Sequence, residues 1–360
     1  MTSKAWFKPS AVPHLVAKFD SAQSSRSIEI WTTTCIVTNF GMQRNRNVGS
    51  HSQATEFSSI GRHLPRCSML INPANPVLTG PHSFPYFPRG GPQPENPPNR
   101  TAHHIMGYVT QWGGMDVGNG MLFPAAVIDG LVHQLGGRRL QNECSMLPKH
   151  SFSRAYSNQQ SQTTLRDDQE VKCPVGAAVV TSSGDKALKA EYDIIIHTVP
   201  PFYKYPPSAN KEIQRLLDTG EEPFDGETWS YKLLLSCYHK SFDLAFQQRD
   251  IDRSSSVLCN LLNRFGYHRR TPPENQRVAV PLLGAGCRGF PTSVAIEAAA
   301  KESAAWLTKT SDGDNSSTKS TENNTTQHRS PQSDCVIAFG LLEPHDAETL
   351  AEKIQVSLNI

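Results

Sequence analysis

Three glycines lie close together in the segment GAGCRGF, at Gly284, Gly286 and Gly289. They follow an apolar run that ends at Leu283 and precede an alanine-rich helical pattern that begins after Pro291. Because glycine has no Cβ, successive backbone N–H groups can approach a ligand and form a nest for an anion. The predicted helix adds its positive N-terminal end. We expect the loop to bind a phosphate or a diphosphate; the alternative is a turn needed only for close strand-to-helix packing.

A second glycine-rich segment, GGMDVGNG at 113–120, also precedes a helical pattern. That helix is expected to begin near Pro124 and to end at Gly136-Gly137. Neither glycine-rich segment matches GxGxxG or GxxxxGK[ST], which disfavours a dinucleotide-fold dehydrogenase and a P-loop NTPase.

Asp129 and His133 belong to this second helix and are four residues apart. That spacing places a carboxylate and an imidazole on one helical face, where the two groups suit general acid–base chemistry. The alternative is a solvated pair on the outer face of an amphipathic helix.

Apolar runs alternate with helical patterns along the chain. Strands are expected at 28–38, 68–73, 177–182, 193–199, 277–283 and 335–341, and helices at 229–246, 291–307 and 346–358. The alternation predicts an α/β protein, a three-layer α/β/α fold with a mixed central sheet of about six strands, most of them parallel. Ligands of such sheets bind beyond the carboxyl ends of the strands, where both glycine-rich segments are expected.

The chain of 360 residues is expected to form one domain over 28–360 after an N-terminal tail at 1–27. Polar insertions are expected near 39–66, 79–112 and 145–170. A Ser/Thr/Asn-rich tract at 308–333 is predicted to be disordered.

The charges are balanced, with 35 Lys and Arg against 33 Asp and Glu. This predicts no direct binding to nucleic acid and no membrane association. Eight cysteines occur without a CxxC pair, so no metal and no cofactor are expected. The absence of an apolar signal core favours a cytoplasmic or nuclear location. The alternative is a transit peptide in the Ser- and Lys-containing N-terminus. The protein is expected to be a monomer.

Six segments resemble, in the same order, motifs of the macrodomain family of ADP-ribose-binding modules. They are INPAN at 71–75, CPVGAAVVT at 173–181, IIHTVPP at 195–201, SYKLLLSCYHKSFDLA at 230–245, PLLGAGCRGFP at 281–291 and CVIAFGLLEPHDAETLAEKI at 335–354. The resemblance covers roughly residues 28 to 357, with large insertions.

The resemblance implies an ADP-ribose cleft whose diphosphate lies between the two glycine-rich loops. The ligand-binding residues that it implies are Asn72, Asn75, Gly114, Asp116, Gly118, Gly120, Met121, Gly284, Ala285, Gly286, Cys287, Arg288, Gly289 and Phe290. Asn75 would face the distal ribose, with turn formation as its alternative role. Phe290 would pack beside the ribose or the adenine, or else belong to the core.

IDGLVHQLGG at 128–137 is similar to a helix of the hydrolytic branch of the family, which assigns catalysis to Asp129 and His133. Their role would be to orient or activate a water against the anomeric carbon. Two departures bear on this assignment. Asp129 lies about nine residues beyond Gly120, which makes Asp116 a rival carboxylate, and Ile36 stands where the family has an adenine-binding aspartate.

The sequence thus predicts an ADP-ribose-binding module that removes ADP-ribose from acidic side chains of a modified protein or from O-acetyl-ADP-ribose. The first alternative is a reader that binds ADP-ribose without turnover. The second is a scaffold protein with a degenerate cleft.

Overall fold

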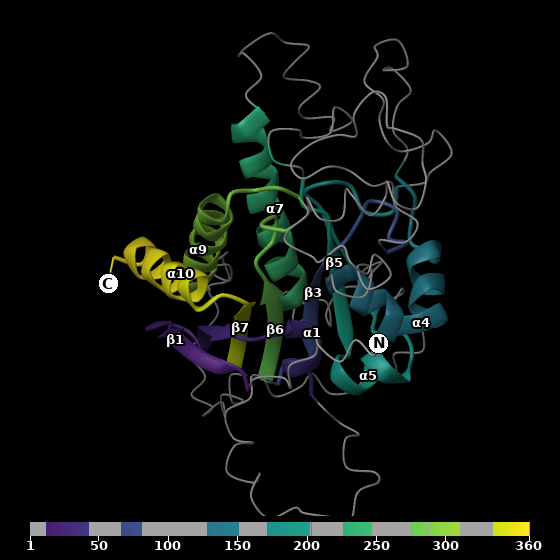
Figure 1. Cartoon of the computed structure of the whole chain (residues 1–360), viewed down its shortest axis with the longest axis horizontal. Coiled ribbons are helices and arrows are strands. Elements are labelled where there is room, and N and C mark those ends of the chain that lie inside the picture. The colour runs from purple at the N-terminus through teal and green to yellow at the C-terminus, as the bar shows by residue number, and fades with distance from the viewer. Residues whose placement is uncertain are drawn as a thin grey trace, which may run out of the picture.

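A seven-stranded sheet lies between two layers of helices (Figure 1). The computed structural model describes residues 12–42, 66–80, 128–150, 171–201, 203, 226–246, 275–286, 288–309 and 334–359. The predicted α/β/α class with a mixed sheet is confirmed, and the sheet has one strand more than expected.

The sheet is parallel in its interior and antiparallel at both edges. Its strands are β1 (His14–Asp20), β2 (Arg26–Thr32), β3 (Met69–Pro73), β4 (Ala178–Ser182), β5 (Ile194–Thr198), β6 (Asn275–Pro281) and β7 (Asp334–Leu341). They are ordered β1-β2-β7-β6-β3-β5-β4, and the pairs β1–β2 and β4–β5 are antiparallel. The carboxyl ends of the five parallel strands therefore meet at one edge.

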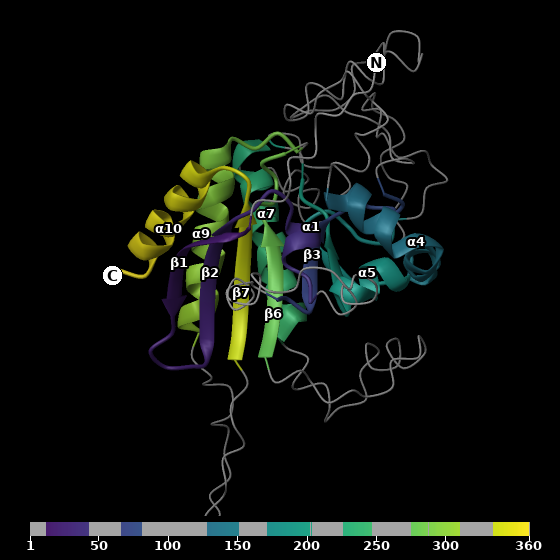
Figure 2. The same ribbon diagram turned by 60° about the horizontal axis from the view of Figure 1, so that its bottom comes forward.

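Helices cover both faces of the sheet. They are α1 (Ile36–Asn39), α4 (Ile128–Met146), α5 (Lys186–Glu191), α7 (Gly226–Phe246), α9 (Thr292–Thr308) and α10 (Pro344–Ser357). One core lies under α7, α9 and α10, and a second core lies under α1, α4 and α5 (Figure 2). No helix in the described ranges is long and apolar enough to cross a membrane.

The inner strands are apolar on both faces because each contributes to both cores. In β3, Ile71 packs into the core under α7 while Leu70 packs into the core under α4. In β5, Ile196 packs into the core under α7 and Ile195 packs into the core under α4. A polar side chain on either strand therefore has to find its hydrogen-bond partners inside the protein.

Two local expectations differ from the structure. The predicted tail at 1–27 contains β1, whose Phe19 packs against the core. The predicted strand 28–38 ends at Thr32, because the chain turns into α1 at Ile36 and buries that residue in the second core. The expected helix end at Gly136-Gly137 is confirmed: Gly137 has φ 58° and ψ −157°, a conformation that glycine alone adopts readily, and a second helical segment of α4 follows this kink.

Most of the predicted insertions and of the Ser/Thr/Asn-rich tract lie outside the described residues, at 43–65, 81–127, 151–170 and 310–333. The glycine-rich segment at 113–120 belongs to the second of these ranges.

Candidate functional site

Asn72, at the carboxyl end of β3, is the centre of a buried polar cluster. Its side chain is fully buried, and its Nδ2 atom donates a hydrogen bond to Asp129 Oδ1 at 2.8 Å. The same nitrogen lies 3.1 Å from Nδ1 of His197, its register partner on the neighbouring strand β5. Asn72 thus joins two strands of the sheet to the first turn of α4.

Asp129 and His133 are buried on α4, at 8% and 4% exposure. His133 Nε2 lies 3.4 Å from Asp129 Oδ1. The expectation that the spacing of four brings the two groups together is met, and the alternative of a solvated pair is wrong, because this face of α4 packs toward β3.

Three atoms of this cluster retain hydrogen-bonding capacity. Asn72 Oδ1 and both ring nitrogens of His133 are buried and make no hydrogen bond to any residue that the structure describes. A buried polar atom without a partner costs about 1–3 kcal/mol. Such groups are consistent with a site whose remaining partners come from a polar ligand.

His197 and Thr181 complete the cluster behind Asn72. Thr181 Oγ1 lies 2.8 Å from His197 Nε2. Burial lowers the pKa of His197 to about 3, and the nearby His133 is the second cause, so the imidazole is neutral at physiological pH. Our sequence reasoning did not single out either residue, although a histidine after three isoleucines in a doubly buried strand is a signal for a buried polar contact.

Asn75 does not reach this cluster, because its amide is bonded within its own loop. Its Oδ1 atom accepts from the backbone N–H of Val77 at 3.1 Å and of Thr79 at 3.4 Å, and its Nδ2 atom donates to the Gly80 carbonyl at 3.0 Å. Asn75 therefore makes the contacts expected for its alternative role, turn formation. The turn presents Gly80 to His133: a Cβ at Gly80 would lie 3.0 Å from the His133 ring.

The glycine loop after β6 also has the local geometry of a turn with an open backbone. Gly284 and Gly289 have φ values of 85° and 75°, which explains glycine at both positions. Gly286 is exposed, and a Cβ added to it would meet nothing within 4 Å.

Arg288 connects this loop to the asparagine motif. Its guanidinium donates to the Ala74 carbonyl at 3.0 Å, so the loop and the end of β3 lie at the same edge of the sheet. Phe290 is fully buried and packs against Tyr203 with ring centroids 5.1 Å apart, which is the geometry of the core alternative.

The other predicted ligand-binding residues lie outside the described residues, namely Gly114, Asp116, Gly118, Gly120, Met121 and Cys287. Ile36, at the position of the family's aspartate, is buried, and its carbonyl accepts a hydrogen bond from the Tyr192 hydroxyl at 2.8 Å. In the described part of the chain, no group of three or more His, Cys, Asp or Glu is arranged to hold a metal ion.

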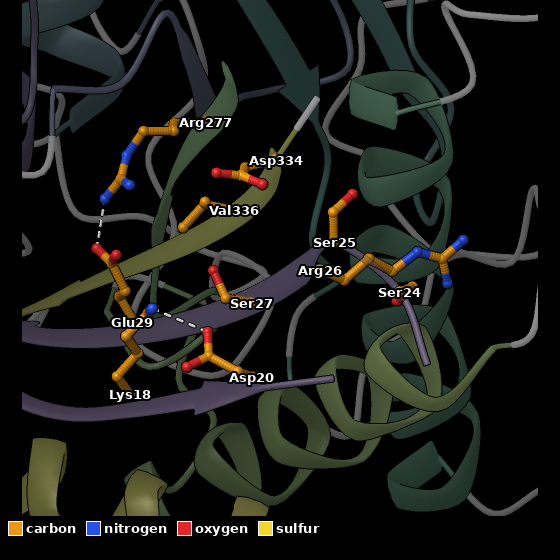
Figure 3. A pocket seen from close by; sticks show the side chains of 10 residues that line it. All are labelled: Lys18, Asp20, Ser24, Ser25, Arg26, Ser27, Glu29, Arg277, Asp334 and Val336. Atoms are coloured by element: carbon orange, nitrogen blue, oxygen red, sulfur yellow. Dashed lines mark hydrogen bonds and ion pairs between the residues drawn. The ribbon is translucent and has the colours of Figure 1, made fainter. Parts of the chain in front are cut away.

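A cavity of about 290 Å³ lies at the opposite, amino-terminal edge of the sheet, beside the first residues of β2 and β7 (Figure 3). Its charged lining residues are three basic and three acidic, and four of them form pairs: Lys18 with Asp20 at 2.9 Å, and Arg277 with Glu29. Trp31 Nε1 also donates to Glu29, at 3.0 Å. Because these charges are compensated, the cavity has no excess charge to attract an anion.

Comparison with known proteins supports the resemblance seen in the motifs. No family model matches this chain. A macro domain-containing protein of Listeria monocytogenes serovar 1/2a is 28% identical over 185 residues, covering 51% of this chain and 66% of the relative. One from serotype 4b is 27% identical over 172 residues, covering 48% and 59%. The chain thus matches less than two thirds of the length of either curated relative.

Among solved structures, the Oceanobacillus iheyensis macrodomain with ADP has a TM-score of 0.41 at 13% identity, covering 96% of this chain and 98% of that one. The macro domain of ganglioside induced differentiation associated protein 2 has a TM-score of 0.37 at 16% identity, covering 80% and 77%.

The six motifs in family order, the mixed sheet with helices on both faces and the two bacterial relatives lead to one assignment. The chain is similar to macro domain-containing proteins, in agreement with the resemblance that its motifs indicate.

Proposed function

We propose that this chain is a macrodomain and binds ADP-ribose at the carboxyl edge of its sheet. The observation that carries the proposal is the buried cluster of Asn72, Asp129 and His133, in which Asn72 Oδ1 and the His133 ring nitrogens make no hydrogen bond to the described residues. The open turn at Gly286 is held at the same edge by the bond from Arg288 to Ala74. Hydroxyl groups of a ribose suit the first feature, and a diphosphate suits the second.

We further propose that the chain hydrolyses ADP-ribose from acidic side chains of a modified protein or from O-acetyl-ADP-ribose. In this reaction Asp129 orients or activates a water against the anomeric carbon, and His133 assists it. Burial of the Asp129 carboxylate beside His133 supports this role, because a catalytic base has to be held in one orientation.

The experiment measures release of ADP-ribose from a protein modified on acidic side chains, with wild type and Asp129→Asn. Loss of a general base lowers kcat by about 10²–10⁴-fold. Asp243→Asn is a matched control, because Asp243 forms an i,i+4 pair with His239 at 3.3 Å on the outer part of α7. The hydrolase proposal fails if wild type releases nothing or if the two variants behave alike.

A second candidate is a reader that binds ADP-ribose without turnover. One observation favours it: the amide of Asn75, expected at the distal ribose, is bonded within its own loop. Binding detected by calorimetry, with no release of ADP-ribose, would support the reader, and absence of binding would reject both functions and leave the scaffold alternative.

A further inference from the structure

Four polar side chains form a continuous buried path from β4 to α4. Thr181 Oγ1 lies 2.8 Å from His197 Nε2, and His197 Nδ1 lies 3.1 Å from Asn72 Nδ2. Asn72 Nδ2 then donates to Asp129 Oδ1 at 2.8 Å. All four residues are buried, so their hydrogen bonds have to be consistent with one another without help from bulk solvent.

The hydrogen positions along this path follow from the chemistry of Asp129. Asn72 Nδ2 lies 2.8 Å from Asp129 Oδ1, so the NH₂ group of Asn72 faces the carboxyl group and donates to it. The second hydrogen of that NH₂ group points at His197 Nδ1 and requires a lone pair there. The ring proton of His197 is then on Nε2, from which it is donated to Thr181.

Thr181, at the end of the path, satisfies the hydrogen bond from His197 and has an acceptor for its own hydrogen. Its hydroxyl accepts from His197 Nε2 and donates its own hydrogen to the Ser182 carbonyl at 3.0 Å. Each donor on the path has one acceptor, and the direction of every bond is determined.

The neutral form of His197 is essential to this arrangement. A protonated ring would carry hydrogens on both nitrogens and would oppose the NH₂ group of Asn72. Burial, and then the electrostatic influence of the nearby His133, lower the pKa of His197 to about 3 and keep the ring neutral. Cys144, 4.0 Å from Nε2, is also uncharged, since burial raises the pKa of its thiol to about 12.

We infer that His197 is a positioning residue of the site: its Nδ1 lone pair fixes the amide of Asn72 in the orientation that holds Asp129. The same orientation leaves Asn72 Oδ1, which has no partner in the described chain, as an acceptor for a ligand hydroxyl. Without this lone pair the amide can rotate, and Asp129 loses its hydrogen bond from Asn72. The inference rests on the proposed function for its catalytic consequence, but the tautomer itself does not depend on catalysis.

The tautomer is tested by ¹⁵N NMR of the histidine rings in the full chain at pH 7, with His197 assigned by comparison with His197→Asn. The inference expects an unprotonated Nδ1 and a protonated Nε2 in a single state. A proton on Nδ1, or averaging between the two tautomers, would overturn it.

The catalytic consequence is tested with two amide variants. In His197→Asn the side-chain oxygen can occupy the position of Nδ1 and accept from Asn72, whereas in His197→Gln the amide reaches only the position of Nε2. We expect His197→Asn to stay within about threefold of wild-type kcat, and His197→Gln to lose about tenfold or more with little change in KM, because misplacement of catalytic groups lowers kcat.

Equal kcat values for the two folded variants would overturn the positioning role. If the variants do not fold, the NMR result on wild type decides the inference, with the His197 ring then assigned through its own backbone resonances. A wild-type protein that releases no ADP-ribose contradicts the hydrolase proposal only, because the tautomer is still measured.

Discussion

The buried side chain of His197 makes the stability of the protein depend on pH. The folded state keeps its ring neutral with a pKa of about 3, whereas the unfolded chain binds a proton near the ordinary value of 6.5. The unfolded state therefore binds more protons as the pH falls, and the free energy of unfolding decreases from about pH 6.5 toward pH 3. Above pH 6.5 both states are neutral and this contribution is constant.

We predict that His197→Asn makes the stability less dependent on pH. Over the window from about pH 6.5 to 5, one proton contributes roughly 1.4 kcal/mol per pH unit, or about 2 kcal/mol in total. Urea unfolding of wild type and of the variant at pH 7 and pH 5 measures this difference. An identical loss of stability in both proteins would show that His197 does not titrate on unfolding.

A second residue-scale prediction concerns the contact of Gly80 with His133. Gly80 has φ +75°, and a Cβ there would lie 3.0 Å from the ring. Gly80→Ala should therefore lower the free energy of unfolding by about 1–2 kcal/mol. Gly286→Ala is the matched control for stability, because its Cβ would occupy open space, and we expect a change within about 0.5 kcal/mol. Equal effects in thermal unfolding would contradict the described contact.

Helix α4 is kinked, and its two halves make different contacts: the first half contributes to the candidate site and the second half contacts β4. Its first turn carries Asp129, and after the kink at Gly137 its second half carries the buried Glu143. Glu143 accepts hydrogen bonds from the backbone N–H and the hydroxyl of Ser182 on β4, which anchors the far end of the helix.

We predict that Glu143→Ala lowers the free energy of unfolding by about 2–3 kcal/mol, since both donors of Ser182 lose their buried acceptor. Arg139→Ala is the control, because Arg139 contacts the same carboxylate at 3.4 Å but its side chain is 48% exposed. We expect less than about 1 kcal/mol for this variant. A similar loss for the two variants in urea unfolding would show that Ser182 is not the important partner.

The edge strand β1 provides another prediction at this scale. Phe19 packs against the core, whereas the adjacent Lys18 is exposed on the opposite face and forms an ion pair with Asp20. Phe19→Ala should cost about 2 kcal/mol, and Lys18→Ala less than about 0.5 kcal/mol. Equal stabilities in thermal unfolding would mean that residues 14–20 behave as the predicted tail.

The differences between sequence and structure have physical causes at this same scale. β3, β5 and β6 were predictable because both of their faces are apolar, and α9 because its alanines recur at helical spacing. β1 was missed because it is an edge strand with no fully buried residue, and Lys18 interrupts its apolar residues. The spacing of Asp129 and His133 predicted their proximity, but the link to His197 depends on the β3–β5 register, which one strand alone cannot reveal.

At the scale of the whole molecule, a ligand that binds only the folded state has to stabilise it. At a concentration of 100 times its Kd, ADP-ribose would raise the free energy of unfolding by about 2.7 kcal/mol. We predict this rise for ADP-ribose and little or none for adenosine, because Ile36 occupies the position of the family's adenine-binding carboxylate and is buried. Thermal unfolding with each ligand measures the difference, and equal stabilisation by both would contradict a site based on the diphosphate.

The most direct measurement is isothermal titration calorimetry of ADP-ribose with the full chain. The proposed site predicts one-to-one binding with a micromolar Kd. Absence of heat up to millimolar ADP-ribose, together with an unchanged melting temperature, would contradict the claim that the carboxyl edge around Asn72 and Gly286 is an ADP-ribose site.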